Sequence, residues 1–238
     1  MVLKIIPNSE NFKGLSIITG FHGIGAAGYW TVKYLVQELK ADRIAIIDSD
    51  APTPMASNNN GKLVSPFEFY RKGDIIFFKV EAPLYKDEDM IFFKELSDFI
   101  INAGFKEAAL IGGLDSRLRL DSSTYRLVKT SAYKPDNNLK NSTFLEDGQI
   151  IVGPLAVMLN RFEAKNFPAY SLLSYASAER VDPRAAVSAL DVLSGHYGFK
   201  IDTTPLLKGA DIIETELEST TDHVRQHGMQ SILKIKGL

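Results

Sequence analysis

The sequence predicts an α/β protein: a three-layer α/β/α sandwich built on a mixed, mostly parallel central sheet. Short apolar, β-branched segments alternate with segments whose apolar residues recur at helical spacing. One predicted hairpin interrupts this alternation, which makes the sheet mixed. No repeat, low-complexity tract or interdomain linker divides the 238 residues, so we expect a single α/β domain over residues 1–238.

The first elements form a βαβ unit. Leu15–Thr19 is apolar and β-branched, as expected of a strand covered on both faces, and Ile24–Leu39 carries apolar residues at helical spacing. Arg43–Asp48 is a second buried strand, so the unit predicts a right-handed crossover to a parallel neighbouring strand. Val2–Ile6 is expected to be a short edge strand, because Pro7 closes it.

The middle of the chain breaks the alternation. Ser49–Asn60 is rich in proline, serine and asparagine and is predicted to be a long loop. Lys62–Tyr70 and Asp74–Val80 are predicted to be the strands of a hairpin, because the turn residues 71–73 separate them.

Helix and strand alternate again after this hairpin. Asp87–Ala103 is predicted to be a helix, since its acidic first turn suits the positive end of the helix dipole and Gly104 suits its carboxyl end. Glu107–Ile111 is an apolar strand that we expect to end in the double glycine Gly112-Gly113.

The last part of the chain continues the αβ pattern. Thr124–Ser131 and Gln149–Val152 are predicted to be strands, and Pro154 begins a helix that precedes the strand Ala169–Tyr175. The dipeptide at 182–183 is expected to cap a helix over residues 184–196. A polar C-terminal helix is expected over residues 204–228, either solvated or used against a partner.

Composition excludes several functions. With 27 basic and 29 acidic side chains the net charge is −2, which gives no electrostatic footprint for nucleic acid or an anionic membrane. No apolar run approaches the roughly 20 residues that span a bilayer. The absence of cysteine excludes disulfides, thiolate metal sites and cysteine nucleophiles, and it fits a reducing, cytoplasmic compartment.

A glycine-rich turn between the first strand and helix has two interpretations. Gly23, Gly25 and Gly28 satisfy G-x-G-x-x-G, and Asp48 follows twenty residues later, as in dinucleotide-binding proteins. Alternatively, the small residues only let the helix pack closely on the sheet. The turn is longer than a dinucleotide turn, and a loop and hairpin replace the second helix after Asp48, so the pattern favours packing.

The double glycine Gly112-Gly113 also has two interpretations. It follows a buried strand, at the carboxyl end where α/β folds place ligands, and it could join the Gly23 turn to line a pocket. Alternatively, it is a loop whose glycines supply positive φ.

Two short patterns are interpreted as chance matches. Tyr125-x-x-x-Lys129 has the catalytic spacing of short-chain dehydrogenases, but the segment is expected to be extended, which sets the two side chains far apart. His223-x-x-x-His227 lacks a third ligand, so no metal site is expected.

Three stretches together carry a family resemblance. They are a glycine-rich turn into a helix in Gly20–Leu39, a strand with a double glycine in Leu110–Leu114, and an Asp-Pro-capped helix within Val152–Ile201. In order and spacing, over residues 15–217, they resemble the proteasome assembly chaperone family, in the branch of the second eukaryotic chaperone subunit and its archaeal homologues.

The resemblance implies an α/β/α core akin to that of nucleoside phosphorylases, a homo-oligomer without catalytic machinery or cofactor, and a docking role toward proteasome α-subunits. Some archaeal relatives end in a hydrophobic-tyrosine-any tripeptide, whereas this chain ends Lys236-Gly237-Leu238, so docking through such a tail is not expected and a binding surface elsewhere stays open. The predicted function is a non-catalytic, oligomeric protein-binding factor. The alternative is a nucleotide- or nucleoside-binding enzyme that uses the Gly23–Gly28 turn.

Overall fold

The computed structural model describes residues 3–7, 10–49, 55–84 and 90–210 of the chain. Its contacts divide the chain into two units between Ile201 and Asp202. All named strands and helices belong to the first unit. In the second unit residues 204–210 are helical, and the rest of the polar helix predicted over residues 204–228 lies outside the described residues.

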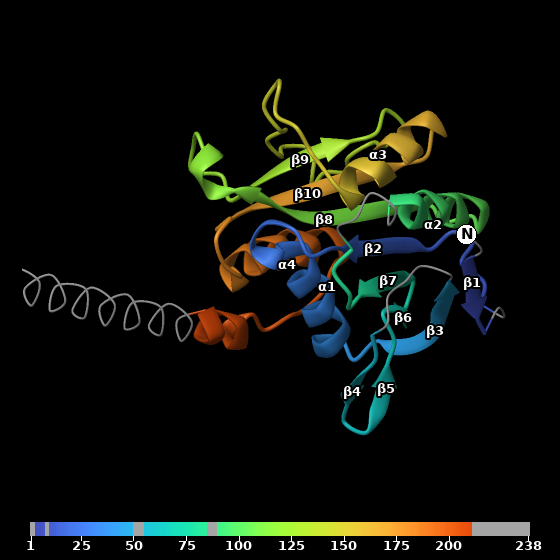
Figure 1. The fold of residues 1–238 in the computed structure, drawn as a ribbon. Helices are drawn as coiled ribbons and strands as arrows, with labels where there is room; N and C mark the ends of the chain where they lie inside the picture. The colour runs from blue at the N-terminus through green and yellow to red at the C-terminus, as the bar shows by residue number, and fades with distance from the viewer. Residues whose placement is uncertain (1–2, 8–9, 50–54, 85–89, 211–238) are drawn as a thin grey trace, which may run out of the picture. The chain divides into compact units, whose positions relative to one another are not determined.

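An eight-stranded mixed sheet forms the centre of the first unit, in the order β1-β3-β6-β7-β2-β8-β10-β9 (Figure 1). Its strands are β1 (Leu3–Ile6), β2 (Ser16–Gly20), β3 (Asp42–Ser49), β6 (Phe67–Lys72), β7 (Ile75–Val80), β8 (Glu107–Asp115), β9 (Tyr125–Lys129) and β10 (Ala169–Ala176). β7, β2, β8 and β10 pair in parallel, whereas the other ladders are antiparallel. Five of the eight strands, these four and β3, therefore run in one direction, which confirms the predicted mixed, mostly parallel sheet.

Helices cover the sheet in two layers. They are η1 (Ile24–Ala26), α1 (Ala27–Glu38), α2 (Met90–Asn102), η3 (Ser116–Leu118), α3 (Pro154–Ala164) and α4 (Pro183–Tyr197). α1 packs with α4, and α2 packs with α3. Ile17 of β2 shares a core cluster with Phe93 of α2 and Met158 of α3, so the next side chain, Ile18, points to the opposite face. This arrangement confirms the predicted α/β/α layers; the likeness to nucleoside phosphorylases stays a prediction.

Local sequence signals end the elements where expected. Gly73, at φ +56°, makes the turn of the β6–β7 hairpin, and Gly104, at φ +79°, follows α2. The Asp182 carboxylate caps α4 by accepting hydrogen bonds from the backbone N–H groups of Arg184 and Ala185. The acidic first turn predicted for α2 lies outside the described residues.

The prediction that β3 is the parallel neighbour of β2 in the sheet is wrong. β3 runs parallel to β2, but the β6–β7 hairpin lies between them, and β3 pairs with β6 instead. All six residues of β7 are buried, so this strand needs cover on both faces and a partner on both edges. The hairpin therefore takes an interior position in the sheet.

Two predicted segments differ in the structure. The predicted loop contains β4 (Ser57–Asn59), which pairs with β5 (Lys62–Val64) across Asn60-Gly61, and both turn residues have positive φ. A proline breaks the segment between β5 and β6, since Pro66 has no N–H for a ladder. Gln149–Val152 belongs to no strand, because its apolar side chains face a cavity and solvent instead of a ladder partner.

Candidate functional site

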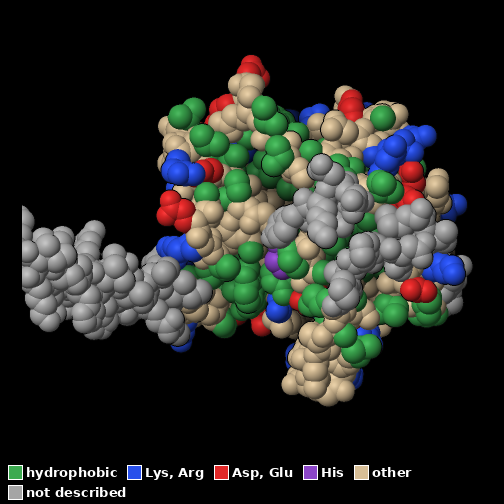
Figure 2. Space-filling model, viewed as in Figure 1, with side chains coloured by type: hydrophobic (Ala, Val, Ile, Leu, Met, Phe, Trp, Pro, Cys, Tyr) green, Lys and Arg blue, Asp and Glu red, His purple; other side chains and the backbone are tan. Residues whose placement is uncertain are grey.

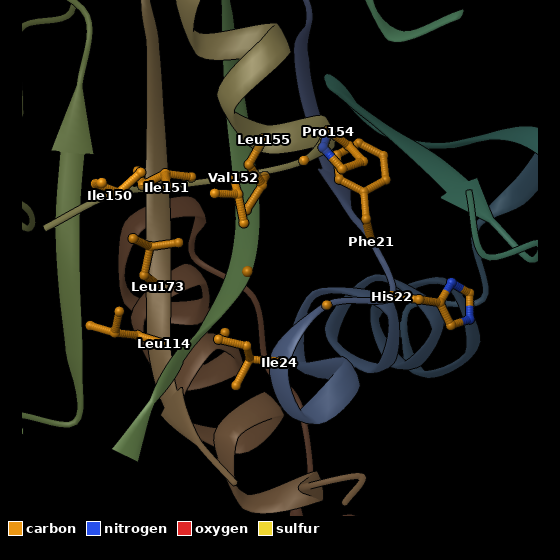
Figure 3. A pocket seen from close by; sticks show the side chains of 14 residues that line it. Phe21, His22, Ile24, Leu114, Ile150, Ile151, Val152, Pro154, Leu155 and Leu173 are labelled. Atoms are coloured by element: carbon orange, nitrogen blue, oxygen red, sulfur yellow. The ribbon is translucent and has the colours of Figure 1, made fainter. Parts of the chain in front are cut away.

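A cavity of about 300 Å³ lies at the carboxyl ends of β2, β8 and β10. The turn after β2 (residues 21–24), the end of β8 (residues 112–114) and the segment that enters α3 (residues 150–155) form its wall (Figure 3). The structure thus brings Gly23 together with Gly112 and Gly113. The carboxyl ends of parallel strands are where open α/β sheets bind ligands.

Two glycines of the G-x-G-x-x-G pattern pack against neighbouring backbone and side-chain atoms and do not open into this cavity. A Cβ on Gly28 would lie 2.8 Å from the backbone nitrogen of Phe21 and would overlap the carbonyl oxygen of Ile111. A Cβ on Gly25 would lie 2.6 Å from the Cβ of Ala176. Gly28 and Gly25 therefore allow close packing, as the second interpretation proposes. Gly23 differs, because a Cβ there would meet nothing within 4 Å.

Of the two interpretations of Gly112-Gly113, the loop with positive φ is wrong, because both glycines lie within β8 and pair with β10, and neither has positive φ. A Cβ on Gly113 would overlap the carbonyl oxygen of Ile24, and a Cβ on Gly112 would overlap the side chain of Leu155. The strand continues through the double glycine, since only glycine lets η1 and α3 approach it this closely.

Asp48 does not reach the glycine-rich turn. It lies on β3 opposite Lys4 of β1, its side chain is exposed, and β6 and β7 separate β3 from β2. With neighbouring strands about 4.8 Å apart, the ribose contact of a dinucleotide fingerprint cannot form across three ladders.

The cavity is apolar. Its larger aliphatic side chains are Ile24, Leu114, Ile150, Ile151, Val152, Leu155 and Leu173. Within the described part of the chain, no aspartate, glutamate, lysine or arginine lines it, and burial lowers the pKa of His22 below 6.5, which leaves that imidazole neutral at pH 7. Ile150 and Val152 are 82% and 77% exposed at its edge. This chemistry suits an apolar or uncharged occupant and offers no cation to a phosphate.

A buried arginine holds the chain that leads into this wall. Arg126 of β9, whose side chain is 1% exposed, lies 2.7 Å from Glu146 and 3.1 Å from Asp121. Its guanidinium carbon is 5.2 Å from the ring centre of Tyr175. Hydrogen bonds from Arg126 lower the pKa of the Glu146 carboxyl. Arg126 thereby fixes the residue four positions before Ile150.

A second group of polar side chains lies between α1 and the β6–β7 hairpin, and the sequence interpretation missed it. Glu68 and Lys79 are cross-strand partners 3.1 Å apart, and Lys79 lies 2.8 Å from Glu81. The Tyr29 hydroxyl donates to Glu81 at 2.7 Å and accepts from Lys33 at 2.9 Å. Two signals were present in the sequence: Tyr29-x-x-x-Lys33 at helical spacing, and charged residues within otherwise apolar strands.

His22 connects the two groups. Its ring stacks on Tyr29 with centroids 4.0 Å apart, and Figure 3 shows it turned away from the apolar side chains of the cavity. Burial and the Glu81 hydrogen bond raise the pKa of Tyr29, so this tyrosine is not activated as an acid. Tyr125 and Lys129 stand at opposite ends of β9, which confirms that their spacing is a chance match.

The described ranges contain neither a metal-ligand cluster nor a helix that could cross a membrane. Within them no group of three or more histidine, aspartate or glutamate side chains is placed to hold a metal ion. His223 and His227 lie outside these ranges. None of the described helices is both long and apolar enough to cross a membrane.

The fold and the cavity define a class: a three-layer α/β/α protein with an apolar pocket at the carboxyl ends of its parallel strands. The model of the PAC2 family matches residues 17–221, and the chain therefore belongs to the PAC2 family. This confirms the resemblance found in the sequence. No curated protein matches the chain.

Solved structures share the fold. PbaA of Pyrococcus furiosus, described as an archaeal homologue of proteasome-assembly chaperone, is 23% identical with a TM-score of 0.75, over 96% of this chain and 95% of that one. PbaB of the same organism, an archaeal proteasome activator, is 21% identical with a TM-score of 0.73, over 92% and 98%. A PAC2 family protein of Streptomyces avermitilis is 18% identical with a TM-score of 0.61, over 86% and 94%.

Proposed function

We propose that this chain is a non-catalytic, oligomeric, chaperone-like protein that binds proteasome α-subunits. The observation that carries the proposal is the apolar cavity, whose edge exposes Ile150 and Val152. Figure 2 shows hydrophobic side chains at the surface where Figure 1 draws β9 and the segment before α3. Exposed apolar side chains gathered beside a pocket are typical of protein interaction sites. The descriptions of PbaA and PbaB support the kind of partner.

The occupant that we propose is an apolar side chain of the α-subunit. The volume of about 300 Å³ is at the lower end of the usual range for ligand pockets. An aliphatic or aromatic anchor in a desolvated pocket is the usual hot spot of a protein interface. Because no charged residue among the described ones lines the cavity, apolar burial supplies the affinity, which should vary little with salt.

The double substitution Ile150→Asp, Val152→Asp is expected to weaken association with the cognate α-subunits by at least about tenfold. Each new carboxylate loses hydration in the complex without gaining a partner. Both side chains are largely exposed, so the free energy of unfolding should change by less than about 0.5 kcal/mol. Native mass spectrometry of the full chain at micromolar concentration measures the complex and the oligomeric state of the free chain.

The matched control is Ile91→Asp, the same change at an apolar residue of α2 that is 55% exposed and does not line the cavity. This variant should bind like the wild type. The proposal is wrong if wild-type protein and α-subunits do not associate at micromolar concentration, or if Ile91→Asp weakens binding as much as the double substitution does.

One observation favours the second candidate function, a nucleoside-binding enzyme: Gly23 faces open space at the carboxyl ends of the parallel strands. An uncharged nucleoside suits the apolar lining better than NAD or ATP. A nucleoside at 100 times its Kd should stabilise the protein by about 2.7 kcal/mol in a thermal-shift assay. Gly23→Leu, which fills the open space, should abolish the shift. The absence of a shift with adenosine, guanosine, uridine and cytidine contradicts this candidate.

A further inference from the structure

A second cavity, of about 380 Å³, lies between α1, the β4–β5 hairpin and the β6–β7 hairpin. Its wall is polar, with contributions from Gln37 of α1, Asn58 of β4, Tyr70 of β6 and Lys79 of β7. We propose that this cavity binds a small organic carboxylate that carries hydroxyl groups. The proposal does not depend on the function proposed above, because no residue lines both cavities.

A buried lysine forms the inner wall of this cavity. The side chain of Lys79 is 7% exposed, and its ammonium lies 2.8 Å from Glu81 and 3.1 Å from Glu68. An ammonium group has three donors, and those of Lys79 are directed to Glu68, Glu81 and Tyr70, so Lys79 contributes positive charge to the wall of the cavity that it lines. Such a buried, oriented ammonium is a preorganised partner for an anion.

Lys33 supplies a second ammonium, from α1. Its Nζ donates to the Tyr29 hydroxyl at 2.9 Å and lies 5.1 Å from the ring centres of Tyr29 and Trp30. Among the described residues it forms no ion pair. Of the described residues, the charged ones that line the cavity are therefore Lys33, Lys79 and Glu81.

The charge behind the wall is already balanced. Glu68 does not line the cavity, and its carboxylate accepts from Arg43 at 2.8 Å and from the Tyr70 hydroxyl at 2.7 Å, in addition to its contact with Lys79. The described side chains that line the cavity therefore carry two positive charges and one negative charge. A ligand with a single carboxylate supplies the second negative charge, whereas a doubly charged phosphate would bring its second charge close to Glu81.

The uncharged polar side chains of the lining are suited to bind hydroxyl groups of a ligand. The side-chain amides of Gln37, Asn58 and Asn59 and the hydroxyl of Ser57 each donate and accept hydrogen bonds. Figure 2 shows the β4–β5 hairpin as largely uncharged, beside basic and acidic side chains. A sugar acid such as gluconate combines one carboxylate with several hydroxyl groups and is the probe we choose.

The test is a titration of the full chain with sodium gluconate, followed by thermal shift and by calorimetry. The wild type should show saturable stabilisation beyond that given by sodium chloride at equal ionic strength. Lys33→Gln, which keeps a long polar side chain, should weaken binding by about tenfold or more, since a charged hydrogen bond is lost. Gln37→Glu, at an exposed position of α1, should do the same by neutralising the wall.

The control is Lys94→Gln, at an exposed lysine of α2. It changes the net charge by the same amount as Lys33→Gln and Gln37→Glu, and it should bind gluconate like the wild type. Saturable binding that is about tenfold or more weaker in both cavity variants and unchanged in the control supports the proposal. The proposal is overturned if gluconate gives no saturable shift, if all variants respond alike, or if sodium phosphate gives the larger saturable shift.

Discussion

Gly28→Ala is expected to lower the free energy of unfolding by about 3 kcal/mol or more, the upper part of the range for overpacked cores. The new Cβ would lie 2.8 Å from the backbone nitrogen of Phe21 and would overlap the carbonyl oxygen of Ile111. Neither neighbour is a side chain that can turn away. α1 and the sheet must therefore separate, which opens the core between them.

The matched control is Gly195→Ala, in α4, where a Cβ would meet nothing within 4 Å. An exposed glycine in a helix interior loses more backbone entropy on folding than alanine does. The Gly195→Ala variant should therefore be more stable by about 0.5–1 kcal/mol. Urea unfolding of both variants, compared through midpoints at a common slope, measures the two effects. Equal shifts, or a stabilised Gly28→Ala variant, contradict the packing role.

The same experiment separates the two interpretations of the glycine-rich turn. A glycine kept only so that a phosphate can approach would tolerate alanine in the ligand-free protein without loss of stability. The structure instead places protein backbone where the Cβ of residue 28 would stand. Of Gly23, Gly25 and Gly28, only Gly23 leaves space for a ligand. The motif matches the nucleotide pattern because both uses require a helix to start close to a strand.

Local patterns in the sequence predicted most strands and helices, because a buried strand or an amphipathic helix shows itself within a few residues. The order of the strands did not follow from such patterns. β3 joins β6 because β7 is buried along its whole length and the β6–β7 hairpin takes an interior position, which is a property of the whole sheet. That β8 continues through Gly112 and Gly113 could not be predicted for a related reason, since Leu155 and Ile24, which pack on these glycines, come from distant segments.

The group of polar side chains between α1 and the β6–β7 hairpin could have been predicted from the sequence. Once the β6–β7 turn is placed at Gly73, the hairpin register sets Glu68 opposite Lys79. An acidic and a basic residue facing each other within apolar strands predict a buried ion pair. The Tyr29–Lys33 contact follows from i, i+4 spacing on α1. The apolar cavity could not be predicted in this way, because its wall depends on how residues 150–155 lie across β8 and β10.

Lys79→Met is expected to lower the free energy of unfolding by about 3–5 kcal/mol at pH 7. Methionine fills similar space but leaves Glu68, whose side chain is 0% exposed, and Glu81 without their shared cation. Uncompensated buried carboxylates are costly even when other donors remain. Urea unfolding at pH 7 measures the loss. Lys94→Met, at an exposed lysine of α2, is the control and should change stability by less than about 0.5 kcal/mol.

The decrease in the free energy of unfolding that Lys79→Met causes should become smaller as the pH falls. In the wild type, hydrogen bonds and the Lys79 charge hold the pKa values of Glu68 and Glu81 below their ordinary value of 4.5. The stability that these carboxylates contribute is therefore complete above about pH 4.5 and is lost as pH falls through the lowered values. In the Lys79→Met variant the two carboxylates protonate more readily, so at low pH they no longer destabilise the folded state as buried charges. Over the same pH range the wild type loses the stability that its ion pairs contribute. The difference in unfolding free energy should be smaller at pH 3 than at pH 7, and a difference that is equal at both values contradicts a charge-based role for Lys79.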